Sequence, residues 1–530
     1  MMSKINLKTA AVFFLMFFLV LTSISYSAGR EEYLIEQLHA LKGVNNAQPK
    51  PMAMTKAGTG KRGECGTSII SEIRKEYNNL SPEGQAEVKK YIFMDQPYSL
   101  KKSSAKITAD AKTIYNKFGL SNTYTTTNFV ILWGDEPYNE NNGTGIPPTD
   151  ENANDVPDLV EQWGEYFEAS WAKQVEGLGL KQPLKTSTYL MDIYIANTAG
   201  STYADYLQLE GGYFAYTDTY SNNMAYIVVN NNMPYSCNDD PDGFQIGAMK
   251  VTAAHEFSHA VQFAYDRNED GWWQEASAVW MEDEVYSYVN DYYNYINGDC
   301  DSGLGWTSEP EIYLTFFGNS SVHQYGDVVW AKYLSINYSG DNMFKDVWEL
   351  CSTKTAINAV DAYLKNNGSN LKSAFKNFSV KNLDFTTNYA PDGENWNTVA
   401  LTSTADFESV SSYKKSVSSS SSTPHPPSYL GANYIRFVNG IGTTLKITFN
   451  GPTNYQGSKV VWGVKVLKIK SAGGSEVATI KLNSSNDGTI KIPSFGSTYD
   501  DVYLAISVLN KGKKNYKNGV PYSVKANLVN

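Results

Sequence analysis

Histidine, cysteine and basic residues are all scarce in this sequence, and each shortage limits what the protein can be. The 530 residues include 5 histidines and 4 cysteines, and 44 lysines and arginines stand against 55 acidic residues, giving a net charge of −11. Nucleic acids and anionic membranes bind basic surfaces. We therefore expect neither a nucleic acid nor an anionic membrane as partner.

Long apolar runs are also scarce. Lys4 and Lys8 precede an uninterrupted apolar run over residues 10–21, and small residues follow it. This pattern predicts a signal peptide over residues 1–27, and the run is short for a bilayer span. An uncleaved anchor is the alternative. We expect a secreted protein with no integral membrane segment in the mature chain.

The length of the chain predicts two or three domains, since single domains hold roughly 100–250 residues. Residues 28–125 alternate helical segments with polar breaks and form either a pro-segment or a structural N-terminal lobe. Residues 126–408 read as one α+β domain. A Ser/Pro-rich linker is expected over 409–428, because its composition cannot bury a core. The short β-rich runs of 429–530 predict a small antiparallel sandwich.

The α+β domain is predicted to begin with strands and to end with helices. Its apolar, β-branched segments predict strands at 129–132, 189–195, 212–216 and 225–229. Between the first two lies a helix with Asp155 as N-cap and Pro157 just inside its start. Further helices are predicted at 244–265 and 273–288, and residues 310–385 are mostly helical.

A metal-binding motif falls inside the helix predicted at 244–265. In His255-Glu256-Phe257-Ser258-His259 the two histidines are four residues apart, which places both rings on one helix face. Neutral imidazoles suit zinc. Glu256 then serves as the general base, taking a proton from zinc-activated water without being a ligand. The alternative is two ordinary histidines on a helix, but with so few histidines in the chain a chance match is rare.

A catalytic zinc needs a third protein ligand and one open position. No metzincin-type extension follows the motif, because residues 260–265 contain no histidine. Glu275 opens the next helix and is the best candidate for the third ligand. Glu282, two turns later on nearly the same face, is expected to orient a ligating imidazole. The alternative for these acids is a solvated helix face.

The motifs at 255–259 and Trp-x-x-Glu-Ala-x-Ala-x-Trp-x-Glu at 272–282 resemble the gluzincin metallopeptidases. More narrowly, residues 126–400 resemble an uncharacterised family of bacterial secreted metalloproteases. The resemblance implies a zincin-like catalytic domain: a mixed sheet, an active-site helix and a helical lower lobe. It also implies that an edge strand, here Ala225 to Asn230, pairs with an extended substrate. The gap between His259 and Glu275 is shorter than in the thermolysin-like and aminopeptidase branches, and the Gly-x-Met-Glu-Asn aminopeptidase signature is missing, which favours endopeptidase action.

Gluzincins usually add a Tyr or His that stabilises the oxyanion of the tetrahedral intermediate. His323 and Tyr325 are the candidates in this sequence, and Tyr325 is preferred because Gly326 next to it allows a close approach. The alternative is a packing tyrosine, in a chain with 38 tyrosines.

Four cysteines, Cys65, Cys237, Cys300 and Cys351, lie far apart in a chain expected to reach an oxidising compartment. One or two disulfides are therefore expected, and the sequence does not choose among the three possible pairings. Residues 62–66 are also loosely similar to the segment whose thiol caps the zinc in some protease precursors. A capping thiol at Cys65 is thus the alternative to a disulfide.

A second metal site is predicted in residues 150–161, which place oxygen donors as in an EF-hand-type calcium loop. Asp155 stands where such loops have glycine, and a polar connection capped by Asp155 is the alternative. The predicted calcium ligands are Asp150, Asn152, Asn154, Asp158 and Glu161.

These patterns predict a secreted zinc endopeptidase that acts on a protein or peptide substrate. A zinc-containing adhesin or surface-recognition protein without turnover is the main alternative, and a non-peptide hydrolase at the same zinc is another. The sequence does not indicate the oligomeric state.

Overall fold

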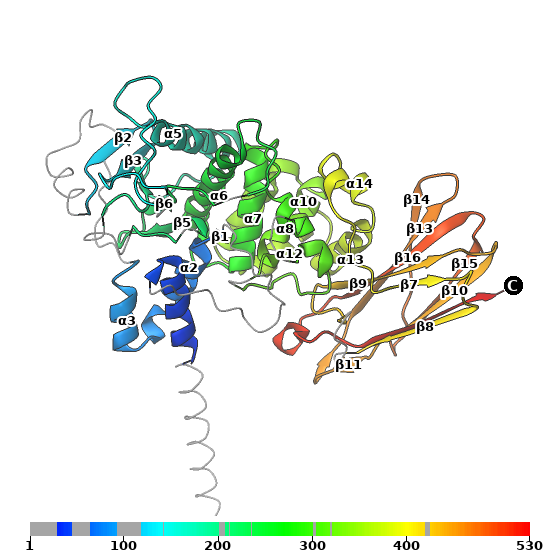
Figure 1. Cartoon of the computed structure of the whole chain (residues 1–530). Helices are drawn as coiled ribbons and strands as arrows, with labels where there is room; N and C mark the ends of the chain where they lie inside the picture. The colour runs from blue at the N-terminus through cyan, green and yellow to red at the C-terminus, as the bar shows by residue number, and fades with distance from the viewer. Residues whose placement is uncertain are drawn as a thin grey trace, which may run out of the picture.

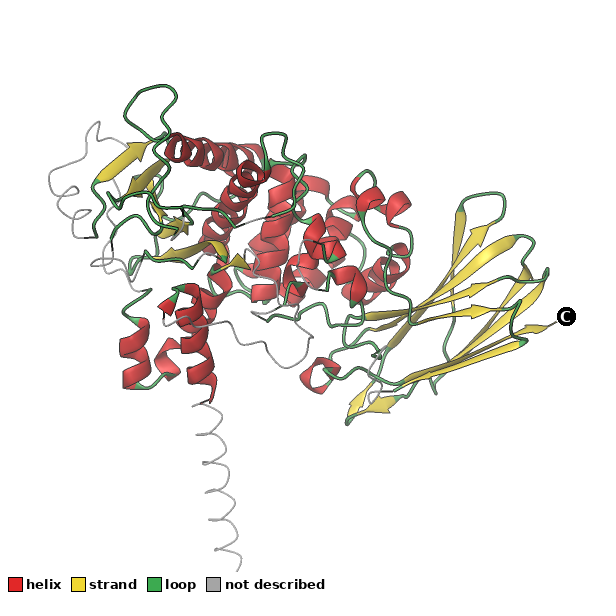
Figure 2. Ribbon diagram, in the orientation of Figure 1, coloured by secondary structure: helices red, strands yellow, loops and turns green. Residues whose placement is uncertain are grey.

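The computed structural model describes residues 29–44, 64–92, 118–140, 143–200, 207–210, 212–234, 236–299, 304–318, 321–418 and 425–529 (Figure 1). The predicted signal peptide at 1–27 and Cys300 lie outside these ranges. Helices and several sheets make a mixed α/β structure, with a helix-rich part followed by a β-rich part (Figure 2). None of the helices in the described ranges combines the length and apolarity needed to cross a bilayer.

A six-stranded mixed sheet lies at the centre of the first part. Its order is β1-β5-β6-β4-β3-β2. The strands β3, β4 and β6 are parallel to one another. β2 runs antiparallel to β3 and β5 runs antiparallel to β6, whereas β1 is parallel to β5. All four strands predicted from the sequence are present. The bounds are β1 (Glu64–Cys65), β2 (Asn122–Thr125), β3 (Phe129–Trp133), β4 (Met191–Ile195), β5 (Tyr213–Thr219) and β6 (Ala225–Val229).

The predicted edge strand is not at the edge. β6 lies between β5 and β4, because a tight turn over residues 220–224 folds β5 back against its outer side. β5 is in turn paired with β1 at Tyr213 and Ala215. The sequence suggested both hairpin strands but not which of them faces the interior of the sheet, so the prediction for 225–230 was wrong.

Both faces of this sheet are covered by helices. In β3, Phe129 and Ile131 pack in the same core as α5 (Asp158–Trp171) and α6 (Phe244–Asp266). Pro157, predicted just inside the first helix, occupies its N-cap position instead, and the helix begins one residue later.

The N-terminal region forms the layer on the opposite face (Figure 1). It contains a helix over residues 29–41, α2 (Thr67–Glu76) and α3 (Pro82–Val88). Val130 and Leu132, which alternate with the residues facing α5 and α6, pack into the core of this layer. The described part of 28–125 thus packs against the sheet and shares a core with it.

The helices after α6 make a lobe beside the sheet, in which α7 crosses α6 next to the predicted motif. The bounds are α7 (Gly271–Val285), α8 (Tyr293–Asn297), α9 (His323–Gly326), α10 (Val328–Asn337), α11 (Met343–Cys351), α12 (Ala356–Asn366), α13 (Leu371–Lys381) and α14 (Phe385–Asn388), with a π-helical turn η3 (Ala172–Gly177) after α5 and 3-10 turns η2 (Tyr77–Asn79), η4 (Trp306–Ser308), η5 (Gly340–Asn342) and η6 (Asp392–Asn395).

The C-terminal strands form a nine-stranded, mostly antiparallel sheet that bends back on itself. One arm is β14-β13-β16-β9-β7 and the other β15-β10-β17-β8, and aromatic pairs such as Phe449 with Trp462 pack between them. The bounds are β7 (Ser403–Asp406), β8 (Ser412–Val417), β9 (Ala432–Val438), β10 (Thr443–Asn450), β13 (Trp462–Lys470), β14 (Ser475–Thr479), β15 (Asp487–Phe495), β16 (Tyr499–Val508) and β17 (Tyr522–Val529), with a separate hairpin of β11 (Asn454–Tyr455) and β12 (Ser458–Lys459) and the turn η7 (Lys513–Tyr516).

The predicted linker 409–428 is not flexible throughout. Residues 412–417 form β8, which pairs with β17. Burial alternates along β8 up to the buried Val417, a period-two pattern that the surrounding serines obscured. Residues 419–424 of the linker lie outside the described ranges.

The cysteines adopt two different states. Cys237 is disulfide-bonded, whereas Cys65 and Cys351 are buried free thiols. At least one disulfide is therefore present, as expected, and Cys65 is not part of it.

Asp218 in β5 offers a test of how firmly the N-terminal layer is attached. Its fully buried carboxylate accepts hydrogen bonds from Arg74 at 2.6 Å, Arg267 at 2.8 Å and the hydroxyl of Tyr226 at 3.0 Å. Asp218→Ala leaves two largely buried guanidinium groups without a counter-ion. It should lower the free energy of unfolding in urea by about 3–5 kcal/mol. Glu176→Ala, at an exposed position, is the control and should change it by less than ~0.5 kcal/mol.

Candidate metal centre

The helix α6 carries the predicted motif through the interior of the protein. Nearly every side chain from Gly247 to Phe263 is buried, so the polar residues within it need partners. The helical spacing places the rings of His255 and His259 side by side, with centroids 4.7 Å apart and Nε2 atoms 3.1 Å apart. This confirms the predicted arrangement of the two imidazoles.

The helix α7 brings the predicted third ligand to the same point. Glu275 Oε2 lies 3.1 Å from His255 Nε2 and 3.6 Å from His259 Nε2. Its other oxygen, Oε1, is buried without a hydrogen-bond partner among the described residues. The two helices therefore place a carboxylate and two imidazoles around one position.

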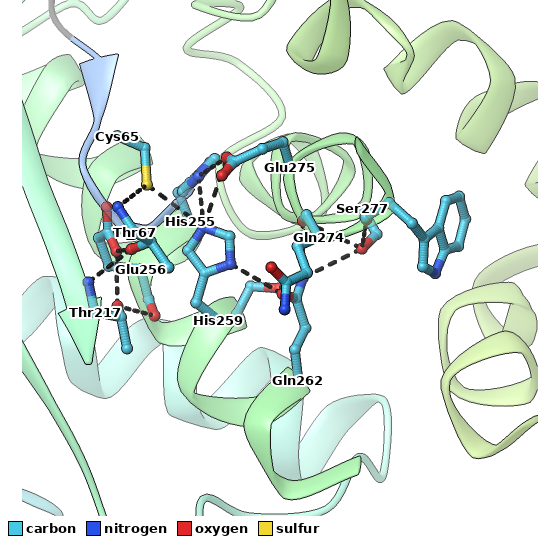
Figure 3. Close-up of polar contacts among 12 residues, drawn as sticks. Cys65, Thr67, Thr217, His255, Glu256, His259, Gln262, Gln274, Glu275 and Ser277 are labelled. Atoms are coloured by element: carbon cyan, nitrogen blue, oxygen red, sulfur yellow. Dashed lines mark hydrogen bonds and ion pairs between the residues drawn. The ribbon is translucent and has the colours of Figure 1, made fainter. Parts of the chain in front are cut away.

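Cys65 of β1 adds a fourth ligand atom, as Figure 3 shows. Its Sγ lies 3.5 Å from His259 Nε2. The four ligand atoms, from Cys65, His255, His259 and Glu275, all lie within 4.8 Å of one another, and all four residues are buried. Of the two interpretations of Cys65 that the sequence left open, the structure contains the thiol beside the predicted metal site and not the disulfide.

Both imidazoles are oriented by partners on their far nitrogens. His255 Nδ1 is 2.6 Å from Glu282 Oε1, which is the role predicted for Glu282. His259 Nδ1 is 2.9 Å from Gln262 Oε1, and Gln262 Nε2 donates to the carbonyl oxygen of Gln274 and the hydroxyl of Ser277. The sequence analysis missed Gln262. A lone amide three residues after a ligand on a buried helix was the available signal.

These partners fix the tautomers of the two rings. A carboxylate and an amide oxygen can only accept, so each Nδ1 carries the proton and each Nε2 presents a lone pair. When both rings are neutral, two lone pairs face each other across 3.1 Å, beside the carboxylate of Glu275. A cation relieves this repulsion. The cluster could therefore hold a metal ion.

The pKa values of His259 and Glu275 also show that the cluster attracts positive charge. Burial lowers the pKa of His259, but the Cys65 thiol and the Glu275 carboxylate outweigh it and raise the pKa to about 10. Burial likewise raises the pKa of Glu275, yet the neighbouring histidines bring it down to about 2. The cluster stabilises protons when no metal is bound, and a divalent ion would displace them.

Glu256, the predicted general base, lies next to the cluster but is not part of it. Its Oε2 accepts hydrogen bonds from the hydroxyl of Thr217 in β5 at 2.6 Å and from that of Thr67 in α2 at 2.9 Å. It lines the same small cavity as Cys65 and His255. Its position beside the ligands agrees with the predicted one.

The cavity above the cluster has a volume of about 20 Å³, room for about one water molecule. Tyr325 lines it, 6.2 Å from the ring of His255 and stacked on Tyr295. His323, the other oxyanion candidate, is not among the lining residues. It is buried beside Phe316, and burial lowers its pKa to about 3. Other residues that line the cavity are Phe214, Val251, Thr252, Glu282 and Asp291.

The predicted calcium loop at 150–161 is held by hydrogen bonds among its own groups. The amides of Asn152 and Asn154 donate to the two carboxylate oxygens of Glu161. Asp155 has a φ of 66°, so it adopts the left-handed conformation that glycine provides in such loops. Among the described residues, the Cys65 cluster is the sole group of three or more His, Cys, Asp and Glu ligand atoms gathered this closely. Calcium binding stays a prediction.

Residues 88–509 match a family of unknown function, DUF6055. The chain belongs to this family. No curated protein is significantly similar to it.

Two solved structures resemble parts of the chain weakly. The pre-peptidase C-terminal domain of a collagenase from Bacillus anthracis is 10% identical over 25% of this chain and 100% of its own, with a TM-score of 0.16. A family GH115 4-O-methyl-alpha-glucuronidase is 12% identical over 54% of this chain and 38% of its own, with a TM-score of 0.15. Scores this low do not establish a shared fold.

Substitution of the ligand and of its neighbours on α7 tests the metal centre. Glu275→Ala should abolish stoichiometric binding of a divalent metal, and Glu282→Gln should weaken it by roughly 10–100-fold by loosening His255. Glu284→Gln is the matched control, because Glu284 pairs with Lys173 away from the cluster. Metal content after dialysis against a graded chelator measures all three. Equal retention by the Glu275 variant and the control would refute the site.

Proposed function

We propose that this protein is a secreted, zinc-dependent endopeptidase of the gluzincin type. The observation that carries the proposal is the placement of Glu256 beside the cluster of His255, His259 and Glu275, on the wall of a cavity that His255 also lines. Two imidazoles and a carboxylate that could bind a metal, next to a second carboxylate that is not among the ligands, suit metal-assisted hydrolysis. Secretion rests on the predicted signal peptide.

Zinc suits the donor set in both type and spacing. Nitrogen, oxygen and sulfur ligands in a tetrahedron are typical of zinc, and bonds of ~2.0–2.3 Å put neighbouring ligand atoms about 3.3–3.6 Å apart. Four of the six separations between the candidate ligand atoms are 3.1, 3.1, 3.5 and 3.6 Å, and all six are within 4.8 Å. These four separations lie within a few tenths of an ångström of those in a zinc tetrahedron.

The mechanism assigns one task to each residue around the zinc. When bound, zinc supplies Lewis acidity to water and to the scissile carbonyl. Glu256 takes a proton from the attacking water and passes it to the leaving amine. Glu282 and Gln262 keep the two imidazoles in the ligating tautomer, and the hydroxyl of Tyr325 donates to the oxygen on which negative charge develops.

A protein or peptide substrate is the proposed class. β5, whose outer side is paired only with the two residues of β1, runs beside α6, and the hydroxyl of Thr217 on it donates to both the carboxylate and the main-chain carbonyl of Glu256. An extended peptide added along β5 would pass over the metal ligands, as in other forms of strand addition. In this proposal β5, and not β6, is the substrate-binding strand of a zincin-like domain.

A second function is favoured by one feature of the site. Four protein ligands close the coordination sphere, and closed sites are typical of structural zinc. A zinc-containing recognition protein without turnover would have this arrangement.

Glu256→Gln distinguishes the two functions. The substitution removes the proton acceptor but keeps the shape and the ligands, so zinc content should be unchanged while hydrolysis falls at least ~10²-fold. We would assay the zinc-loaded protein on a quenched fluorescent peptide library, with Cys65→Ser as a second background in which no thiol closes the site. Equal rates with and without the Glu256→Gln substitution in that background would favour the recognition protein.

Tyr325→Phe tests the proposed oxyanion donor. Loss of one such donor should lower kcat by about 10²–10³-fold with little change in KM, because the interaction forms mainly in the transition state. Tyr295→Phe is the control, since Tyr295 stacks on Tyr325 within the same cavity. Equal, small effects of both substitutions would assign Tyr325 to packing.

A further inference from the structure

The segment from Cys65 to Thr67 contacts three parts of the proposed catalytic machinery at once. Cys65 Sγ lies in the metal-ligand cluster, Gly66 N donates to the Ala215 carbonyl on β5, and Thr67 Oγ1 donates to Glu256 Oε2. Figure 3 shows Cys65, at the end of β1, and Thr67, at the start of α2, on the side of the site away from Glu275. Cys65 also lines the cavity.

We propose that residues 64–67 are a built-in inhibitor, in which the Cys65 thiolate is the fourth ligand of the metal and β1 occupies the substrate's place along β5. The proposal rests on the proposed peptidase function. In this state the protein is latent.

The first support is coordination. A catalytic zinc keeps one position open for water, whereas here a fourth donor lies among the other three. Cys65 is 8% exposed and has no disulfide, so its sulfur faces the ligand cluster and not solvent. A thiolate bound there excludes the attacking water.

The second support is the pairing of β1. Glu64 and Cys65 pair in parallel with Tyr213 and Ala215, on the outer edge of β5. A peptide that extends the sheet would need the same main-chain donors and acceptors. The space left beside the cluster, about 20 Å³, holds about one water molecule, and Cys65 of β1 lines it. A peptide that pairs with this part of β5 must therefore displace β1.

The third support is the state of the general base. The hydroxyl of Thr67 donates to Glu256 Oε2 at 2.9 Å and accepts from the Thr217 main-chain nitrogen at 2.7 Å. Glu256 Oε2 and the main-chain nitrogen of Thr217 are both hydrogen-bonded to Thr67 while residues 64–67 are in place. Departure of residues 64–67 would open the fourth coordination position, the edge of β5 and one lone pair of Glu256 together.

Gly66 permits this close approach. A Cβ on Gly66 would lie 3.1 Å from the Cβ of Tyr216 and 2.6 Å from a methyl carbon of Leu41. The Leu41 methyl can rotate away, but the Cβ of Tyr216 is fixed to β5. We therefore expect Gly66→Ala to keep the thiol but to shift it by a few tenths of an ångström away from β5 and the cluster.

Release needs only a local change. β1 has two residues and an irregular register, and α2 has no side-chain cap at its first residue. On α2 the apolar core of the N-terminal layer starts at Ile69 and Ile70, beyond residues 64–67, so departure of those residues would leave its side chains in place. In the proposed latent state, the thiolate–metal bond would add to the β1–β5 pairing and to the hydrogen bond from Gly66 N in holding residues 64–66.

The test combines spectroscopy with activity, on the full mature chain loaded with cobalt(II). Thiolate coordination gives a charge-transfer absorption in the near ultraviolet, which we expect in the wild type and in Cys351→Ser. We expect it to be absent in Cys65→Ser and weakened in Gly66→Ala. Cys351 is the matched control, because it is the other buried free thiol and lies outside the cluster.

Activity is then measured on the zinc-loaded forms of the same variants. If the capped state outweighs the open state by ten to one or more, Cys65→Ser should raise peptide hydrolysis by about tenfold or more, Gly66→Ala should raise it less, and Cys351→Ser should leave it unchanged. Circular dichroism of each variant checks that it is folded. Should Cys65→Ser not fold, Gly66→Ala carries the same two readouts.

The outcomes separate this proposal from the proposed function. An absent charge-transfer band in the wild type overturns the ligand assignment, whatever the activity. A band together with wild-type activity equal to that of Cys65→Ser overturns the inhibition and leaves the peptidase standing. A band with no hydrolysis in any variant overturns both the peptidase and the latency, and assigns the cluster to a structural zinc.

Discussion

Two imidazole nitrogens face each other inside this protein, and the surrounding structure depends on the positive charge, from protons or a metal ion, that holds them together. The Nε2 atoms of His255 and His259 are 3.1 Å apart, and in the neutral rings the partners of the Nδ1 atoms leave both Nε2 atoms with a bare lone pair. Burying such a pair without a cation costs several kcal/mol. A metal ion converts the same contact into two coordination bonds.

The need for a cation between the two imidazoles involves elements that are far apart in sequence. The two histidines come from α6, Glu275 from α7 and Cys65 from β1, so an ion bound by all four would join two helices of the interior to the outermost strand of the sheet. The partners of the ligands extend the link. Ser277 accepts from Trp348 on α11 and from Gln262, whose amide oxygen fixes His259. Metal binding is therefore coupled to the packing of the whole helical lobe.

The sequence could predict those parts of the site that regular geometry determines. The two histidines follow from the rise of an α-helix, and Glu275 and Glu282 follow from one more helix returning across the first. The parts it missed depend on pairing between distant segments. β1 has two residues and no periodic pattern, so nothing local shows that Cys65 lies on the edge of β5. The order of β5 and β6 was wrong for the same reason, since both strands are buried and apolar and their local sequences do not rank them.

Charge balance bears on whether the closed cluster is structural or catalytic. A thiolate at Cys65 and a carboxylate at Glu275 together neutralise a divalent ion, so a structural site would be complete with these two and the neutral imidazoles. Glu256 adds a third acidic side chain, 1% exposed, and its hydrogen-bond partners are the neutral hydroxyls of Thr67 and Thr217. Burying that carboxylate beside an already neutral site is unfavourable, and structural coordination does not require it. In the proposed peptidase, a base that must accept a proton once the thiolate has left would account for it, because departure of Cys65 would restore a positive charge to the metal that Glu256 then balances.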